Sequence, residues 1–213
     1  MVAIPLRIMT ADAHPVFREG LAAILSAQSD MVLVAEATDG NQALSLFRKH
    51  RPDVTLLDIY LSGMSGLDVI ATIRRDFPNA RFLVLTTHTG DAHVQRALKA
   101  GASGYLLKNT VRRYLLESIR AVHHGQRRIP TEVASHLVEY ITAEALTARE
   151  IQVLGQVANG NANKIIADRL SISEDTVKAH MKNILSKLAA NDRTHAVTIA
   201  IRRGILELDA VAS

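Results

Sequence analysis

The sequence predicts a five-stranded, doubly wound α/β domain followed by an all-α helical domain. Up to about residue 124, short apolar runs alternate with amphipathic stretches, whereas only amphipathic stretches follow that point. Strict alternation of strands and helices with short connections is typical of a parallel sheet with helices on both faces. The chain has 213 residues, of which 48% are hydrophobic, so it can build two small cores.

The first domain, placed at residues 1–124, is expected to contain five strand–helix units. The apolar runs predict strands over 6–11, 31–36, 53–58, 81–86 and 103–107. The amphipathic stretches predict helices over 15–28, 40–50, 66–77, 91–100 and 111–124. Glycine-containing pairs such as Asp39-Gly40 and Ala100-Gly101 supply turn and cap chemistry at the predicted breaks.

The rest of the chain is expected to be helical. Residues 125–145 are interpreted as a linker in which Thr131 opens a short amphipathic helix to about residue 142. The second domain is placed at 146–213. Its helices are predicted over 147–159, 162–170, 173–188 and 192–203, a compact bundle with one helix-turn-helix pair. Thr147 followed by Glu150 predicts a capping box, and Ser173 is expected to begin the long helix in the same way.

Polar side chains stand at the ends of four predicted strands: Asp12, Asp58, Thr86 and Lys108. Because the carboxyl ends of parallel strands meet in one crevice, we expect these side chains to lie together. Asp58 would supply a carboxylate nucleophile, Thr86 would orient a phosphoryl oxygen and Lys108 would offset phosphoryl charge. A single acid at a strand end is usually a cap or a loop ligand. The set of four favours phosphoryl acceptance.

Composition excludes several classes of protein. The chain has no cysteine, which excludes disulfides and thiolate metal sites and suits a reducing cytoplasm. Its first residues lack a long apolar segment with a cleavage site, so we expect neither secretion nor a membrane span. The net charge of +4 permits nucleic-acid binding without requiring it.

Residues 5–124 resemble the receiver domain of bacterial two-component response regulators of the NarL/FixJ subfamily. The matching segments are Asp12–Leu21, Leu57-Asp58, Gly63–Leu67 and Ala97–Lys108. The resemblance implies that Asp58 accepts a phosphoryl group from a sensor histidine kinase and that Thr86 and Lys108 bind its oxygens. It also implies that Tyr105 acts with Thr86 as a conformational switch. The alternative for Tyr105 is an ordinary strand aromatic.

The family pattern places two acids after the first strand, and the second acid is a direct Mg²⁺ ligand. Here Asp12 is followed by Ala13, and Leu61-Ser62 stands where the family often has Met-Pro. The implied ligands are Asp12, Asp58 and the backbone carbonyl of Tyr60, with Mg²⁺ binding weakened by Ala13. Either the receiver is atypical, or Ala13 is an engineered substitution.

Residues 146–206 resemble a LuxR-type helix-turn-helix domain. The matching segments are Leu146–Glu150, Asn163–Ala167 and Thr176–Leu188. The resemblance implies that the long helix is the recognition helix, that the last helix often dimerises and that the protein binds promoter DNA as a homodimer.

On the long helix, helical spacing places Val177, Met181, Ile184, Leu185 and Leu188 on the core side. Contacts with bases or phosphates are expected from Lys164, Thr176, Lys178, Ala179, Lys182 and Asn183. From the residues alone, this side could equally be a solvated helix face.

We therefore expect a cytoplasmic, phosphorylation-controlled transcriptional regulator and not an enzyme. One alternative is a transcription factor whose receiver works without phosphate because Ala13 spoils the metal site. Another is a phosphohydrolase of the haloacid dehalogenase type, which also uses a strand-end aspartate. That class needs a second acid two residues on, where this chain has Tyr60.

Overall fold

The computed structural model describes residues 4–87, 91–129 and 145–206, which form two compact units. The first is built on a parallel sheet in the order β2-β1-β3-β4-β5. The strands are β1 (Leu6–Ala11), β2 (Met31–Ala37), β3 (Val54–Asp58), β4 (Phe82–Thr86) and β5 (Gly104–Leu107). The predicted doubly wound α/β fold is confirmed.

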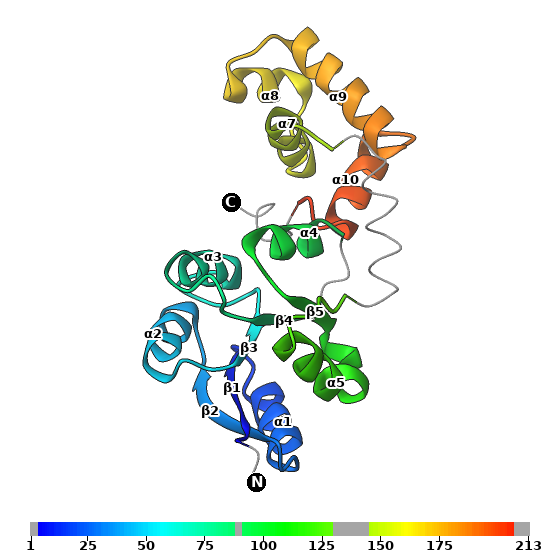
Figure 1. Ribbon diagram of the computed structural model, residues 1–213. Helices are drawn as coiled ribbons and strands as arrows, with labels where there is room; N and C mark the ends of the chain where they lie inside the picture. Colours follow the sequence, from blue (N-terminus) through cyan, green and yellow to red (C-terminus); the bar gives the residue numbers. More distant parts are fainter. Residues whose placement is uncertain (1–3, 88–90, 130–144, 207–213) are drawn as a thin grey trace. The chain divides into compact units, whose positions relative to one another are not determined.

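Helices cover both faces of this sheet (Figure 1). On one face lie α1 (Pro15–Ser26) and α5 (Val111–His123), and on the other lie α2 (Gly40–His50), α3 (Gly66–Asp76) and α4 (Asp91–Ala100). Strand residues such as Leu56 and Leu83 pack with Leu21 of α1 and Ile119 of α5 in one buried cluster. Strands β3, β4 and β5 are buried at every residue, which explains why they read as continuous apolar runs.

Every helix and strand predicted within the described residues is present, and the ends differ by one or two residues. One element was not predicted: a single 3₁₀ turn, η1 (Lys108–Thr110), joins β5 to α5. The helix expected to reach residue 142 lies outside the described residues. No helix within the described ranges has both the length and the apolar character needed to cross a membrane.

The second unit contains α7 (Ala148–Ala158), α8 (Asn163–Leu170), α9 (Glu174–Leu188) and α10 (Arg193–Arg202). Its core includes Leu154, Ile166, Val177, Ile184 and Ile199, at least one from each helix. The turn between α8 and α9 passes through Ser171, whose φ of 52° lies in the left-handed region. The predicted all-α bundle is confirmed.

Caps fix the starts of these helices. At α7, the Thr147 hydroxyl accepts from the Glu150 amide, and the Glu150 carboxylate accepts from the Thr147 amide at 2.7 Å, so the predicted capping box is present. At α9, the Ser173 hydroxyl accepts from the Thr176 amide at 3.1 Å. The expectation of a second capping box is wrong, because the third helical residue is Thr176 and carries no carboxylate to accept from the Ser173 amide.

Candidate phosphoacceptor site and nucleic-acid interface

The register of the sheet brings the predicted phosphoacceptor residues to one edge. Asp58 ends β3 beside Leu85, Thr86 ends β4 beside Leu107, and Lys108 follows β5 directly. Asp12 follows β1 in the same way. Asp12, Asp58 and Thr86 are buried, with exposed fractions of 1%, 3% and 0%. Two carboxylates at the carboxyl edge of a parallel sheet therefore lie almost out of solvent.

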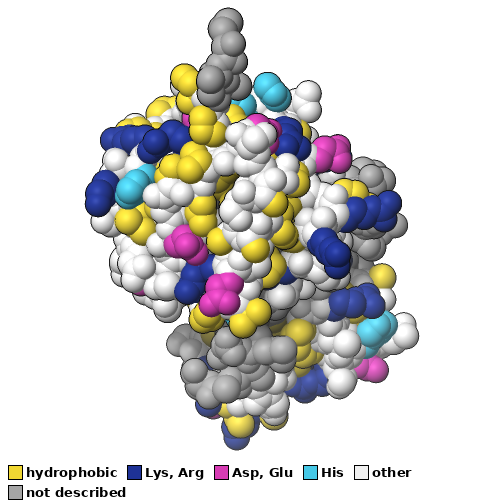
Figure 2. Space-filling view, turned by 90° about the horizontal axis from the view of Figure 1, so that it is seen from below, with side chains coloured by type: hydrophobic (Ala, Val, Ile, Leu, Met, Phe, Trp, Pro, Cys, Tyr) yellow, Lys and Arg dark blue, Asp and Glu magenta, His cyan; other side chains and the backbone are white. Residues whose placement is uncertain are grey.

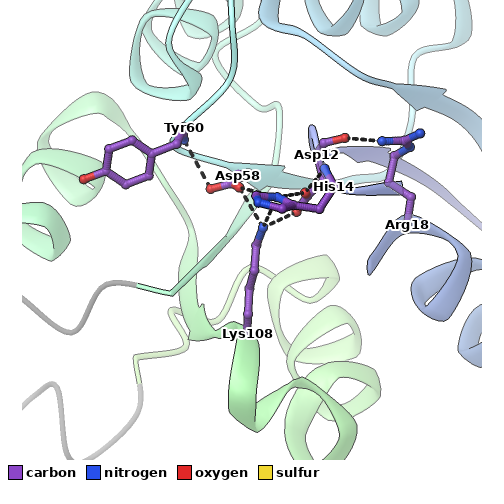
Figure 3. A network of polar contacts seen from close by, with 6 residues as sticks. All are labelled: Asp12, His14, Arg18, Asp58, Tyr60 and Lys108. Carbon is purple, nitrogen blue, oxygen red and sulfur yellow. Dashed lines mark hydrogen bonds and ion pairs between the residues drawn. The ribbon is translucent and has the colours of Figure 1, made fainter. Parts of the chain in front are cut away.

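Lys108 joins the two acids. Its Nζ lies 2.6 Å from Asp12 Oδ2 and 2.7 Å from Asp58 Oδ2, and Figure 3 shows the side chain reaching between them. Asp12 Oδ2 is buried and makes no hydrogen bond of regular geometry. Among the described residues, the ion pair with Lys108 is the interaction that offsets its charge. Buried like charges are costly unless a cation lies between them, and Lys108 supplies that cation.

The loop after β3 holds Asp58 from the other side. The Tyr60 amide donates to Asp58 Oδ1 at 3.2 Å, and the Tyr60 ring points away from the cluster (Figure 3). The Gly66 amide donates to the Ile59 carbonyl at 2.9 Å. A Cβ at Gly66 would overlap the carbonyl oxygen of Asp58. The start of α3 is therefore packed directly against the backbone of the candidate phosphoacceptor.

The two candidate switch residues are in contact. Thr86 and Tyr105 are both fully buried and share a side-chain hydrogen bond. Burial raises the pKa of the Tyr105 phenol above its ordinary value. The two side chains therefore contact each other directly.

His14 was not predicted as a site residue, yet it belongs to the same cluster. Its Nδ1 lies 2.9 Å from Asp12 Oδ1, 4.0 Å from Asp58 Oδ2 and 3.4 Å from Lys108 Nζ. The His14 amide also donates to Asp12 Oδ1 at 2.8 Å. The available sequence signal was the spacing Asp12-x-His14 just before Pro15 at the start of a helix, which favours a turn that folds His14 back over Asp12.

The donor atoms suit a divalent cation. Ligand atoms of Asp12, His14 and Asp58 all lie within 4.8 Å of one another, and two of these residues are buried carboxylates. Carboxylate oxygens are the preferred ligands of hard divalent ions. Ala13 is exposed and offers no ligand. The acidic pocket is thus built from two strand-end acids.

An apolar hollow of about 490 Å³ adjoins this cluster on the α1–α5 side of the sheet. Phe17, Leu21, Ile24 and Val111 line it together with His14 and Lys108. Lys108 Nζ lies 4.7 Å from the centre of the Phe17 ring, so the same ammonium group faces the acids and an aromatic surface.

In the helical unit, α9 has the two sides that the sequence predicts. Val177, Ile184 and Leu188 are buried, and Met181 and Leu185 pack against the same core. The opposite side carries the predicted contact residues: Lys178, Ala179, Lys182 and Asn183 are exposed, and Thr176 is half-buried. Lys164, on α8, is also exposed.

The lysines of α9 are in different electrostatic situations. Lys178 Nζ pairs with Asp175 Oδ1 at 2.8 Å, and this hydrogen bond raises the pKa of Lys178. Within the described ranges, Lys182 makes no such pair. Its charge is therefore available to a ligand without breaking an ion pair.

Charge is distributed over the surface in small groups. On the face shown in Figure 2, Lys and Arg side chains form several separate groups with Asp and Glu between them. Net charge alone therefore does not locate a nucleic-acid interface on that face, whereas the exposed side of α9 provides a candidate surface.

Both units of this chain are similar to known protein families. Residues 8–120 match the family described as response regulator receiver domain, and residues 144–200 match the family described as bacterial regulatory proteins, luxR family. The nitrate/nitrite response regulator protein NarP of Escherichia coli (strain K12) is 39% identical over 208 residues, which cover 94% of this chain and 97% of NarP.

Two solved structures are similar over most of their length. The response regulator ChrA of a heme-sensing two-component system is 36% identical, with a TM-score of 0.56, over 95% of this chain and 99% of ChrA. RcsB from Salmonella enterica serovar Typhimurium, bound to a promoter in the presence of the phosphomimetic BeF3⁻, is 25% identical, with a TM-score of 0.72, over 91% and 97% of the chains. The chain therefore belongs to the two-component response regulators of the NarL/FixJ type, transcriptional regulators that join a receiver domain to a LuxR-type helix-turn-helix domain.

Proposed function

We propose that Asp58 is the phosphoacceptor through which this regulator is controlled. The observation that carries the proposal is the Asp58 carboxylate, buried at the end of β3 with Lys108 Nζ 2.7 Å away. In the reaction, an Asp58 carboxylate oxygen attacks phosphorus, the bond from phosphorus to the donor breaks, and the donor leaves with the electron pair. During this transfer the Lys108 ammonium pairs with a phosphoryl oxygen, which lowers the energy of the charged transition state.

Asp12, Asp58 and the backbone carbonyl of Tyr60 would hold a divalent ion beside the reacting oxygen. Such an ion supplies positive charge to the phosphoryl oxygens. Thr86 supplies a hydroxyl to a phosphoryl oxygen, and this exchange would weaken its hydrogen bond to Tyr105. The rearranged Thr86–Tyr105 pair transmits phosphorylation through the receiver.

The proposed phosphoryl donor is a sensor histidine kinase, and the apolar hollow beside Lys108 offers a surface on which such a donor could dock. We assign the receiver to residues 1–124, the linker to 125–145 and the DNA-binding domain to 146–213. The protein acts in the cytoplasm, where promoter DNA is accessible, and serves as a regulator without an enzymatic activity of its own on other substrates.

Promoter DNA is the proposed ligand of α9. The exposed Lys178, Ala179, Lys182 and Asn183 form a strip that fits a major groove, with Thr176 and Lys164 near phosphates. The solved structure of RcsB bound to promoter DNA in the presence of a phosphomimetic supports this assignment. A homodimer would place two such helices on one site.

Intact-mass measurement after treatment with acetyl phosphate tests the acceptor. One added phosphoryl group is expected in the wild type and none in Asp58→Ala. DNA sites selected from a random pool by the purified protein then serve as ligand in a titration. Phosphorylation should tighten binding of the wild type and leave Asp58→Ala unchanged. Labelling that persists in Asp58→Ala would contradict the assignment.

A further inference from the structure

Ala13 stands where the family has its second acid, and the next side chain that offers a donor atom at this site is His14. Ala13 is exposed and has no donor atom, whereas His14 folds back so that Nδ1 lies 2.9 Å from Asp12 Oδ1 and 4.0 Å from Asp58 Oδ2. An imidazole nitrogen therefore stands at the mouth of the pocket, beside two buried carboxylates.

This donor set differs chemically from one made of oxygen atoms alone. Mg²⁺ prefers oxygen ligands in near-octahedral geometry and dehydrates reluctantly. Imidazole is a good ligand for divalent transition metals, whose affinity for mixed nitrogen and oxygen sites rises along the first row. With alanine in place of the second acid, the imidazole of His14 is the third donor beside the two carboxylates, and this mixed set favours Mg²⁺ less than a set of oxygen atoms alone would.

We infer that His14 is a metal ligand and that Asp12, His14 and Asp58 bind a divalent transition metal, with Mn²⁺ as the reference ion, in preference to Mg²⁺. The inference rests on the proposed function, since the same ion would serve phosphorylation of Asp58. It concerns which metal the pocket selects and which residue selects it.

The geometry allows the ligands to converge. The His14 side chain is 67% exposed, so its ring can turn from Asp12 toward an ion without a packing cost. Asp12 Oδ2 is buried without a regular hydrogen bond. It faces the space between the two acids, where Lys108 Nζ lies. Lys108 can withdraw toward the neighbouring hollow and Phe17 when an ion replaces its ammonium group between the acids.

The test uses the full chain and two variants, His14→Gln and His124→Gln. His124 is an exposed histidine at the end of α5, so its variant is a matched control for loss of an imidazole. Free Mn²⁺ is measured by electron paramagnetic resonance, and Mg²⁺ affinity is measured by its competition with Mn²⁺. We expect His14→Gln to weaken Mn²⁺ about tenfold and Mg²⁺ less than about twofold. We expect His124→Gln to change neither.

Pulsed electron paramagnetic resonance adds a readout that a purely structural role would not change. Modulation from a coordinated imidazole nitrogen is expected on bound Mn²⁺ in the wild type and in His124→Gln, and is expected to vanish in His14→Gln. Absence of nitrogen modulation in the wild type, or equal losses of Mn²⁺ and Mg²⁺ affinity in His14→Gln, would overturn the inference.

Failure of the inference and failure of the proposed function can be told apart. Labelling of Asp58 by acetyl phosphate without any nitrogen signal would reject His14 as a ligand and retain Asp58 as the acceptor. A nitrogen signal without labelling of Asp58 would retain His14 as a ligand and reject Asp58 as the acceptor.

Discussion

Lys108 neutralises part of the negative charge of the two acids at this site. Its ammonium group lies within 2.7 Å of both Asp12 and Asp58, which would otherwise be two buried charges of the same sign. The geometry also explains how the pocket remains compatible with phosphorylation although Ala13 supplies no ligand. Because position 13 is alanine, the pocket contains one negative charge fewer for a cation to neutralise.

Restoring the missing acid tests this account at the level of one residue. In Ala13→Asp, a third carboxylate enters an exposed position at the pocket mouth, so Mg²⁺ affinity should rise by about tenfold, or roughly 1.4 kcal/mol. Isothermal titration calorimetry measures the affinity. Ala13→Asn, which has the same size without the charge, is the control. Equal Mg²⁺ affinity in Ala13→Asp and the wild type would mean that position 13 does not face the ion.

Glycines at the starts of two helices set the geometry at the next scale. Gly66 places α3 against the Asp58 carbonyl, and Gly40 places α2 against the Met64 carbonyl, in both cases where a Cβ would overlap backbone. The β3–α3 loop is therefore packed between two helix starts, and its position determines where Asp58 points.

Gly66→Ala should accordingly lower both the free energy of unfolding, by about 2–4 kcal/mol, and the rate at which acetyl phosphate labels Asp58. Gly20→Ala is the matched control, because Gly20 lies inside α1 with nothing within 4 Å of its added Cβ. That control should gain about 0.5–1 kcal/mol from the higher helix propensity of alanine. Urea unfolding measures the free energy of unfolding of both variants, and intact-mass measurement over time gives the labelling rate. If Gly66→Ala had the same free energy of unfolding and labelling rate as the wild type, the β3–α3 loop would be able to move away from the added Cβ.

A second link between elements is the ion pair that joins the start of α7 to the end of α9. Glu150 Oε2 accepts from Lys187 Nζ at 2.9 Å as well as from Thr147. Burial alone would raise the pKa of Glu150, but the Thr147 amide and Lys187 outweigh it, and the pKa of Glu150 is lowered. The folded state therefore gains stability above the pKa of unfolded glutamate and loses it as the pH falls through the lower folded pKa.

Glu150→Gln isolates the charge, because glutamine can still complete the capping box. It should lower the free energy of unfolding at neutral pH by about 1–2 kcal/mol, and this difference from the wild type should disappear as the pH falls below the folded pKa of Glu150. Denaturant unfolding as a function of pH measures it. Lys187→Met and the double variant complete a thermodynamic cycle. A difference that persists in acid would assign the effect to packing and not to charge.

The sequence was sufficient for the elements and for four of the site residues, and insufficient for contacts made through space. Periodicity located every described strand and α-helix to within two residues but not the 3₁₀ turn η1, and alternation fixed the edge at which Asp12, Asp58, Thr86 and Lys108 meet. His14 was not predicted as a site residue, because its place in the cluster depends on a turn that folds it back over Asp12. The pairing of Glu150 with Lys187 joins residues 37 positions apart, so local pattern could not reveal it.

For the whole molecule, control and DNA binding must be measured together. Lys182 is exposed on α9 and makes no ion pair with described residues, so Lys182→Ala should cost about 1–3 kcal/mol at a selected DNA site and less on random DNA. Fluorescence anisotropy with the phosphorylated protein measures both affinities. Lys164→Ala, expected to remove a phosphate contact, should weaken the two equally. Equal losses in Lys182→Ala would make that residue a phosphate contact as well.

The Lys108 bridge has a consequence for the electroneutrality of the site. Leaving His14 aside, Asp12, Asp58 and Lys108 carry one net negative charge. Phosphorylation of Asp58 replaces one negative charge by roughly two, and a divalent ion adds two positive charges, so the loaded site sums to about zero. With an acid at position 13 the same sum would be negative. In this chain the phosphorylated, metal-bound pocket is thus the uncharged one, and its stability should depend less on ionic strength than that of the resting pocket.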